Sequence, residues 1–249
     1  MTTESELQLL ATWHQEPTSV SEIDKALAGI WQGVQKRSDE ATDEGEIDPH
    51  PVITRTSVMN LLVYSASRGV SERAASAITH LGGTHPSRSI LIVGEPADPT
   101  SSLGASIAAH CFTVGPQGRG FCFEQIDLTA RGEVIGRLPG IVTQLLVHDL
   151  PTLLWWPGDP PLSDPFFTAM TGVCDRLIVD SSDFSDPEGE LQRLADFARM
   201  PHGPCGVSDL NWDRLADWRE ILAQFFDAAP MRPYLHHVEA VQIDYAFDP

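Results

Sequence analysis

Buried-strand patterns alternate with helical patterns through residues 51–205, and this alternation is what most limits the possible folds. SVMNLLVYS (57–65) is a continuous apolar run, as in a strand that is covered on both faces. An Ala-rich helix pattern (71–83) and a second apolar strand, HPSRSILIVGEP (85–96), follow it. Such a βαβ unit predicts parallel strands and a right-handed crossover. The sequence therefore predicts an α/β fold with an open, mostly parallel, Rossmann-like sheet and flanking helices.

A hairpin is predicted after this unit. ASIAAHCFTVG (105–115) and GFCFEQIDLTA (120–130) are two strand patterns around a turn-rich GPQGRG segment. Strand and helix patterns continue beyond it. Asp164 and Asp186 stand where N-caps are expected, each directly before a proline.

The four cysteines predict no metal site. Cys111, Cys122, Cys174 and Cys205 show no CxxC and no Cys/His pair at zinc spacing. Their spread indicates free thiols in a reducing compartment. Cys111 and Cys122 fall on the adjacent hairpin strands, where two buried core cysteines are favoured over a redox pair.

The two ends of the chain differ from the middle. Residues 19–37 form an amphipathic helix pattern, followed by an acidic linker, and every predicted buried strand follows Pro51. At the other end, a Trp-rich helix (209–230) precedes an alternating strand pattern (234–247). Three parts are therefore predicted: an N-terminal helix and linker (1–50), an α/β core (51–205), and a C-terminal helix-strand segment (206–249), expected to be the start of a second domain cut short at Pro249.

The charge of the chain limits its partners. It holds 35 acidic and 16 basic residues, a net charge of -19, so nucleic acid and anionic membrane surfaces should repel it. No apolar run approaches the ~20 residues of a spanning helix, and the N-terminus has no signal-peptide pattern, which favours the cytoplasm. The acidity favours solubility first and steering of a complementary partner second.

No catalytic, cofactor or metal motif is present. GxGxxG, GxSxG and HExxH are absent, and the nine histidines show no HxH or HxxxH spacing. In an open parallel sheet, ligands bind beyond the carboxyl ends of the strands. At these ends the sequence places a possible ligand crevice at Glu95, Asp180 and Ser181.

The tryptophans are candidate partner contacts. Trp155 and Trp156 are neighbours on a predicted strand, so their side chains must point to opposite faces. We expect Trp156, Pro157 and Asp159 to lie on an exposed aromatic-proline ridge and Trp155 to be in the core, although the two tryptophans could be exchanged. Trp212 and Trp218 are six residues apart on a helix and thus roughly 120° apart. The apolar face of that helix is expected to pack against the sheet or a second domain, with one of these tryptophans at its margin.

Six blocks in the same order resemble the OpcA family. They are RTSVMNLLVY (55–64), HPSRSILIV (85–93), CFEQI (122–126), DLPTLLWWPGDPP (149–161), DRLIVDSSDF (175–184) and DLNWDRLADWREILAQFFD (209–227). The resemblance implies a non-catalytic partner that binds glucose-6-phosphate dehydrogenase and promotes its active oligomer. Family members continue beyond the last strand predicted here. The rival hypothesis is a sugar-phosphate-binding enzyme or sensor that uses the strand-end crevice.

Overall fold

A computed structural model of the 249-residue chain describes all residues except 1–5, 44–52, 115–118, 201–202, 204 and 243–249. The strands are β1 (Glu6–Gln15), β2 (Ile53–Arg55), β3 (Met59–Ser65), β4 (Ser87–Glu95), β5 (Leu103–Val114), β6 (Arg119–Arg131), β7 (Thr152–Trp155), β8 (Arg176–Val179) and β9 (Gly206–Asp209). The α-helices are α1 (Val20–Asp43), α2 (Arg68–Leu81), α3 (Leu138–Leu145), α4 (Pro165–Thr171), α5 (Pro187–Ala198), α6 (Leu210–Arg214) and α7 (Ala216–Gln224). Three 3₁₀ helices, η1 (Gly132–Arg137), η2 (Ser181–Asp183) and η3 (Arg232–His237), complete the described elements.

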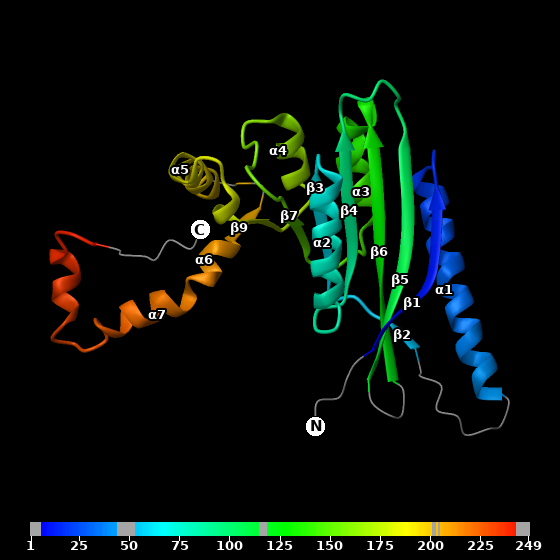
Figure 1. Ribbon diagram of the computed structural model, residues 1–249, viewed down its shortest axis with the longest axis horizontal. Coiled ribbons are helices and arrows are strands. Elements are labelled where there is room, and N and C mark those ends of the chain that lie inside the picture. The colour runs from blue at the N-terminus through cyan, green and yellow to red at the C-terminus, as the bar shows by residue number, and fades with distance from the viewer. Residues whose placement is uncertain (1–5, 44–52, 115–118, 201–202, 204, 243–249) are drawn as a thin grey trace.

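The nine strands form one sheet, in which eight follow the order β1-β5-β6-β4-β3-β7-β8-β9 (Figure 1). The short strand β2 pairs with the first residues of β6, next to the N-terminal end of β4. Every pair from β6 to β9 is parallel, and the pairs β1–β5 and β5–β6 are antiparallel. The predicted α/β fold with an open, mostly parallel sheet is therefore confirmed, including the βαβ unit β3–α2–β4.

Helices cover the two faces of the sheet unequally. The chain steps from β3 to β4 in one direction across the sheet, and from β6 to β7, β8 and β9 in the opposite direction. Because all of these crossovers are expected to be right-handed, the helix of the first lies on one face of the sheet and the helices of the later ones lie on the other face. On the first face, α2 packs on a small cluster that includes Val63 and Ile78. On the second face, α1, α3, α4 and α5 share the main core, which includes Ile23, Leu138 and Phe167. On the first face, the C-terminal end of α2 reaches Phe123 of β6, and the remainder of β5 and β1 carries no helix among the described residues, as antiparallel strands allow.

The hairpin β5–β6 is confirmed, and its two cysteines are joined. Cys111 and Cys122 lie directly opposite each other in the register and form a disulfide, so the prediction of free thiols is wrong for this pair. Sequence pattern cannot find such a pairing because it depends on the register of the two strands. The thiols of Cys174 and Cys205 are free, as predicted.

Residues before Pro51 contribute to the sheet and to its core. β1 pairs antiparallel with β5 along the edge of the sheet, although no strand was predicted there. Ile23 and Leu27 of α1 are buried in the main core, and α1 continues to Asp43, beyond its predicted end. The edge strand β1 thus precedes Pro51, while every described strand that holds buried residues follows it, as predicted; the remainder of the predicted linker (44–50) lies outside the described residues.

A buried ion pair links α1, β2, β4 and β6. The Glu124 carboxylate, which is 1% exposed, accepts hydrogen bonds from Arg55 Nη2 (2.6 Å), Arg88 Nε (2.6 Å) and Trp31 Nε1 (2.7 Å). Arg88 Nη1 also donates to the carbonyl of Leu145 at 2.7 Å, where α3 ends. Elements that are far apart in the sequence are thus joined through one carboxylate.

The C-terminal segment differs most from its prediction. β9 adds an edge strand, and the predicted long helix is divided into α6 and α7 at Leu215. Both helices extend away from the sheet (Figure 1). The predicted strand is wrong over residues 234–242, where η3 is followed by chain without regular structure; residues 243–247 are not described. Within the described chain, the helices are all too short or too polar to cross a membrane.

Candidate functional site

The helices α6 and α7 expose a set of large apolar side chains, which we call the C-terminal aromatic surface. Its members are Trp212, Leu215, Trp218, Ile221, Leu222 and Phe225. Their exposed fractions run from 44% at Leu215 to 67% at Trp218. The expectation that this face packs against the sheet is therefore wrong in the structure. Concentrated exposure of this kind is typical of interaction surfaces.

Polar contacts hold the start of this surface to the sheet. Asp209 caps α6 by accepting from the backbone N–H of Asn211. It also accepts from Ser181 Oγ at 2.7 Å. Arg214 pairs with Asp180 at the end of β8, and its hydrogen bond lowers the pKa of that carboxyl to about 2. The position of α6 is therefore fixed by charged and polar side chains.

Trp155, the last residue of β7, and Trp156, directly after it, point to opposite faces of the sheet, as predicted, but the exposed position expected for Trp156 is wrong. Trp156 is only 7% exposed, and its ring stacks on Tyr64 with the centroids 4.7 Å apart. The ring also packs edge-to-face against Phe167, with the ring centroids 5.0 Å apart, so Trp156 belongs to the main core. Trp155 is half-buried on the face of α2, and its Nε1 is the one buried side-chain polar atom without a hydrogen-bond partner among the described residues.

The remainder of the expected ridge is only partly exposed. Pro157 is half-buried, and Asp159 is exposed. Asp159 Oδ1 accepts from the backbone N–H of Ser185 at 2.9 Å, and its Oδ2 accepts from Ser185 Oγ at 2.5 Å. This carboxylate fastens the loop after β7 to the chain before α5. The expected exposed ridge is therefore wrong for Trp156.

The three predicted crevice residues are not brought together. β4, which ends at Glu95, is separated from β8 by β3 and β7. Glu95 pairs with Arg68 and Arg131, while Asp180 and Ser181 contact Arg214 and Asp209. Each of these side chains thus already has a partner within the protein.

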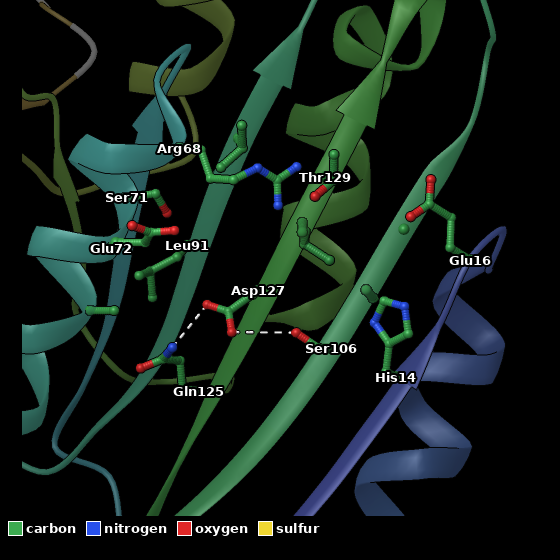
Figure 2. A pocket seen from close by; sticks show the side chains of 15 residues that line it. His14, Glu16, Arg68, Ser71, Glu72, Leu91, Ser106, Gln125, Asp127 and Thr129 are labelled. Carbon is green, nitrogen blue, oxygen red and sulfur yellow. Dashed lines mark hydrogen bonds between the residues drawn. The ribbon is translucent and has the colours of Figure 1, made fainter.

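A polar cleft lies on the open face of the sheet between α2 and β1. Its volume is about 290 Å³, and Figure 2 shows Asp127 in its floor between Gln125 and Ser106. Gln125 Nε2 donates to the carboxylate at 2.9 Å and Ser106 Oγ donates at 3.4 Å. Burial raises the pKa of Asp127, and no described basic side chain pairs with it. This cleft was not predicted, because β1, which forms one of its walls, was not recognised as a strand.

Two further features bear on chemistry. Nowhere in the described part of the chain do three or more His, Cys, Asp or Glu side chains gather as they would around a metal ion. The thiols of Cys174 and Cys205 are neighbours, and the hydrogen bond between them lowers the pKa of Cys205 while raising that of Cys174. The Cys174–Cys205 pair therefore consists of two neighbouring free thiols and is not assigned as a catalytic site.

Comparisons with known proteins match two family models. Residues 78–196 match the model described as glucose-6-phosphate dehydrogenase subunit N-terminal domain, and residues 205–249 match the corresponding C-terminal domain. The C-terminal aromatic surface thus lies in the second match. The boundary between the two matches falls just before β9.

Curated relatives agree with these models. An OxPP cycle protein OpcA of Synechocystis sp. is 31% identical over 166 residues, which are 66% of this chain and 34% of the relative. The OpcA proteins of Nostoc punctiforme and Synechococcus elongatus are 34% and 33% identical, each over 57% of this chain and 30% and 32% of their own lengths. The chain thus spans about a third of the length of the relatives it matches. On both family models and these relatives, the chain belongs to the OpcA family.

Proposed function

We propose that this chain binds glucose-6-phosphate dehydrogenase in the cytoplasm and promotes its active oligomer, as a non-catalytic activator in the oxidative pentose phosphate pathway. Membership of the OpcA family supports this role. The absence of catalytic motifs from the sequence is consistent with it. The whole relatives are longer than this chain, so the proposal concerns the part of the role that these residues carry.

The C-terminal aromatic surface is the observation that carries the proposal. Trp218 is 67% exposed and Phe225 is 65% exposed, on a helix that extends away from the sheet. Leaving such side chains in water forfeits roughly 1.5–3 kcal/mol for each one that could be buried. Aromatic anchors of this kind dominate the affinity of protein interfaces. Trp212, also predicted as a partner contact, belongs to the same surface.

The test measures the dehydrogenase of the same organism with and without this chain. Sedimentation velocity should show a complex and a shift toward the larger dehydrogenase oligomer, together with higher dehydrogenase activity. Trp218→Ala should weaken binding by about thirtyfold, the effect of losing a ~2 kcal/mol anchor. Leu81→Ala, at a 50% exposed position on α2, is the matched control and should bind as the original chain does. If Trp218→Ala and Leu81→Ala bind the dehydrogenase equally well, the aromatic surface is not part of the interface.

A separate assay addresses catalysis. The chain alone should not turn over glucose 6-phosphate or 6-phosphogluconolactone. A measurable rate that disappears in Asp180→Asn or Asp159→Asn would support a sugar-phosphate enzyme instead. Circular dichroism of both variants would show whether such a loss reflects unfolding.

A further inference from the structure

A groove runs along the free edge of the sheet between α5 and α6. Its volume is about 480 Å³, and its main lining residues are Leu191, Leu194, Ala198, Val207, Trp212 and Asp213. β9 forms one side of it and pairs only with β8 within the described sheet (Figure 1). The groove therefore joins an unpaired strand edge to the beginning of the C-terminal aromatic surface.

The walls of the groove are apolar and partly held in place. Leu194 is 5% exposed and anchors the floor, while Leu191 and Trp212 are 42% and 62% exposed. The Arg219 guanidinium lies 3.9 Å from the centroid of the Trp212 ring and donates to the Trp212 carbonyl at 2.6 Å. This contact orients the indole before any partner binds, which lowers the entropy cost of binding.

The rim of the groove is acidic. Residues 186–227 contain nine acidic and four basic side chains. Asp213 lines the groove, Asp217 and Glu220 follow on α7, and no described basic side chain forms an ion pair with any of the three. The nearby arginines are already engaged: Arg214 holds Asp180, and Arg219 covers Trp212. An occupant that supplies positive charge at this rim would meet complementary potential.

We propose that this groove docks a segment of the dehydrogenase that carries apolar side chains flanked by lysine or arginine. The inference rests on the proposed function and adds the place and the chemistry of recognition. A second copy of this chain fits less well, because each copy carries a net charge of -19 and would place acid against acid.

The experiment measures binding of the purified dehydrogenase to the full chain and to four variants, by biolayer interferometry at about 50 mM and about 300 mM NaCl. Charge is tested with Asp213→Lys against Asp24→Lys, an equal charge change at an exposed site on α1. Apolar contact is tested with Leu191→Ser against Leu81→Ser on α2, both at partly exposed sites that should not affect folding. Circular dichroism and thermal unfolding are recorded for every variant.

The original chain should bind the dehydrogenase more weakly at the higher salt concentration, because salt screens the attraction between the acidic rim and basic side chains of the partner. Asp213→Lys should lose about tenfold in affinity and show a smaller salt dependence, while Asp24→Lys should change by less than about twofold. Leu191→Ser should lose more affinity than Leu81→Ser.

Three outcomes would overturn the inference. If the original chain binds and both groove variants match their controls, the groove is not the docking site and the proposed function stands. If the original chain does not bind at either salt concentration, the proposed function itself fails. If the chain alone forms a dimer that Leu191→Ser dissociates, the groove is an interface between copies.

Discussion

Aromatic side chains are buried in the sheet region and exposed in the C-terminal helices. Trp156 stacks on Tyr64 and is 7% exposed, whereas Trp218 of α7 and Phe225, directly after this helix, are 67% and 65% exposed. Both regions carry apolar residues at the spacing of a covered face. The difference is that β7 has a layer of helices to pack against and α7 has none among the described residues. An amphipathic pattern thus identifies the face that requires cover without identifying what covers it.

The largest expected effect tests this contrast directly. Trp156→Ala should lower the free energy of unfolding by about 3–5 kcal/mol, because it leaves a cavity between Tyr64 and Phe167. Trp218→Ala should change it by about 0.5 kcal/mol or less, as at other exposed positions. Urea denaturation followed by far-ultraviolet circular dichroism measures both. Similar losses in the two variants would mean that α7 packs on the body of the protein in solution.

The second prediction extends the contrast from aromatic to charged groups. Burial raises the pKa of Glu124, but the hydrogen bond from Arg55 and the charge of Arg88 outweigh it, so the pKa lies below the ordinary 4.5. Glu124→Gln should cost about 3 kcal/mol at neutral pH, since it leaves the Arg88 charge buried without a counter-charge. A carboxylate whose pKa is lowered on folding stabilises the protein above its unfolded pKa. That stability is lost as the pH falls below about 4.5.

Denaturant titrations between neutral pH and pH ~3 measure the Glu124 effect. The gap between the original chain and Glu124→Gln should narrow as the pH falls, because the original chain then loses the same charge. Glu133→Gln, at an exposed position on η1, is the control and should show no such gap. A gap that is constant with pH would assign the cost to packing and not to charge.

Local patterns predicted much of the body of the protein. The βαβ unit, the hairpin and the caps at Asp164 and Asp186 all follow from residues that are close in the sequence. Each of these depends on apolar periodicity or on a side chain bonding a nearby backbone N–H.

The elements that were missed depend on partners far along the chain. β1 is a strand because it pairs with β5, about a hundred residues later, and its pattern is interrupted by a register shift between Leu9 and Ala11. β9 has the sequence GVSD, with Val207 as its one large apolar residue, so it shows no apolar run such as those of β7 and β8. Apolar and polar residues alternate over 234–242 as they would in a strand, but no described strand lies beside them. Pro233 instead stands at the start of η3, which includes residues 234–237.

The candidate site was predicted only in part. Period-two alternation fixes that Trp155 and Trp156 face opposite ways, but not which face holds the larger core. That choice depends on the direction of the crossovers, which places α4 beside Trp156. Trp212 and Trp218, predicted on one helix, lie on α6 and α7, and their contact with a partner stays a prediction. The groove beside Trp212 depends on α5 and β9, so it could not be inferred from the Trp-rich segment alone.

A smaller effect concerns the attachment of the C-terminal helices to the sheet. Arg214→Ala removes the partner of Asp180 and should lower the free energy of unfolding only slightly, since the arginine is half exposed and solvent screens the pair. The hydrogen bond from Arg214 lowers the pKa of Asp180 to about 2. The attachment should therefore be complete above the ordinary value of 3.8 and be lost as the pH falls through about 2.

Amide hydrogen exchange separates this local effect from global unfolding. In Arg214→Ala, exchange should become faster in α6 and α7 and stay unchanged in β3 and β4. Faster exchange throughout the sheet would show that the C-terminal helices and the body unfold as one unit. Arg199 directly follows α5, and its guanidinium lies 3.9 Å from the Asp196 carboxylate. Arg199→Ala is the control and should leave the exchange of α6 unchanged.

The smallest effect compares two carboxylates of β6 that point to opposite faces of the sheet. Glu124 is surrounded by arginines, whereas Asp127 in the polar cleft receives hydrogen bonds only from Gln125 and Ser106 (Figure 2). Burial raises the pKa of Asp127 above the ordinary 3.8, so its charged form opposes folding. Its contribution has the opposite sign to that of Glu124: stability falls as the pH rises from about 3.8 through the folded pKa.

Asp127→Asn should therefore raise the free energy of unfolding at neutral pH by up to about 1 kcal/mol, and the gain should vanish near pH 3. Denaturant titrations at both pH values measure it, and a loss of stability at neutral pH would mean that the charged carboxylate is stabilised by a cation in solution.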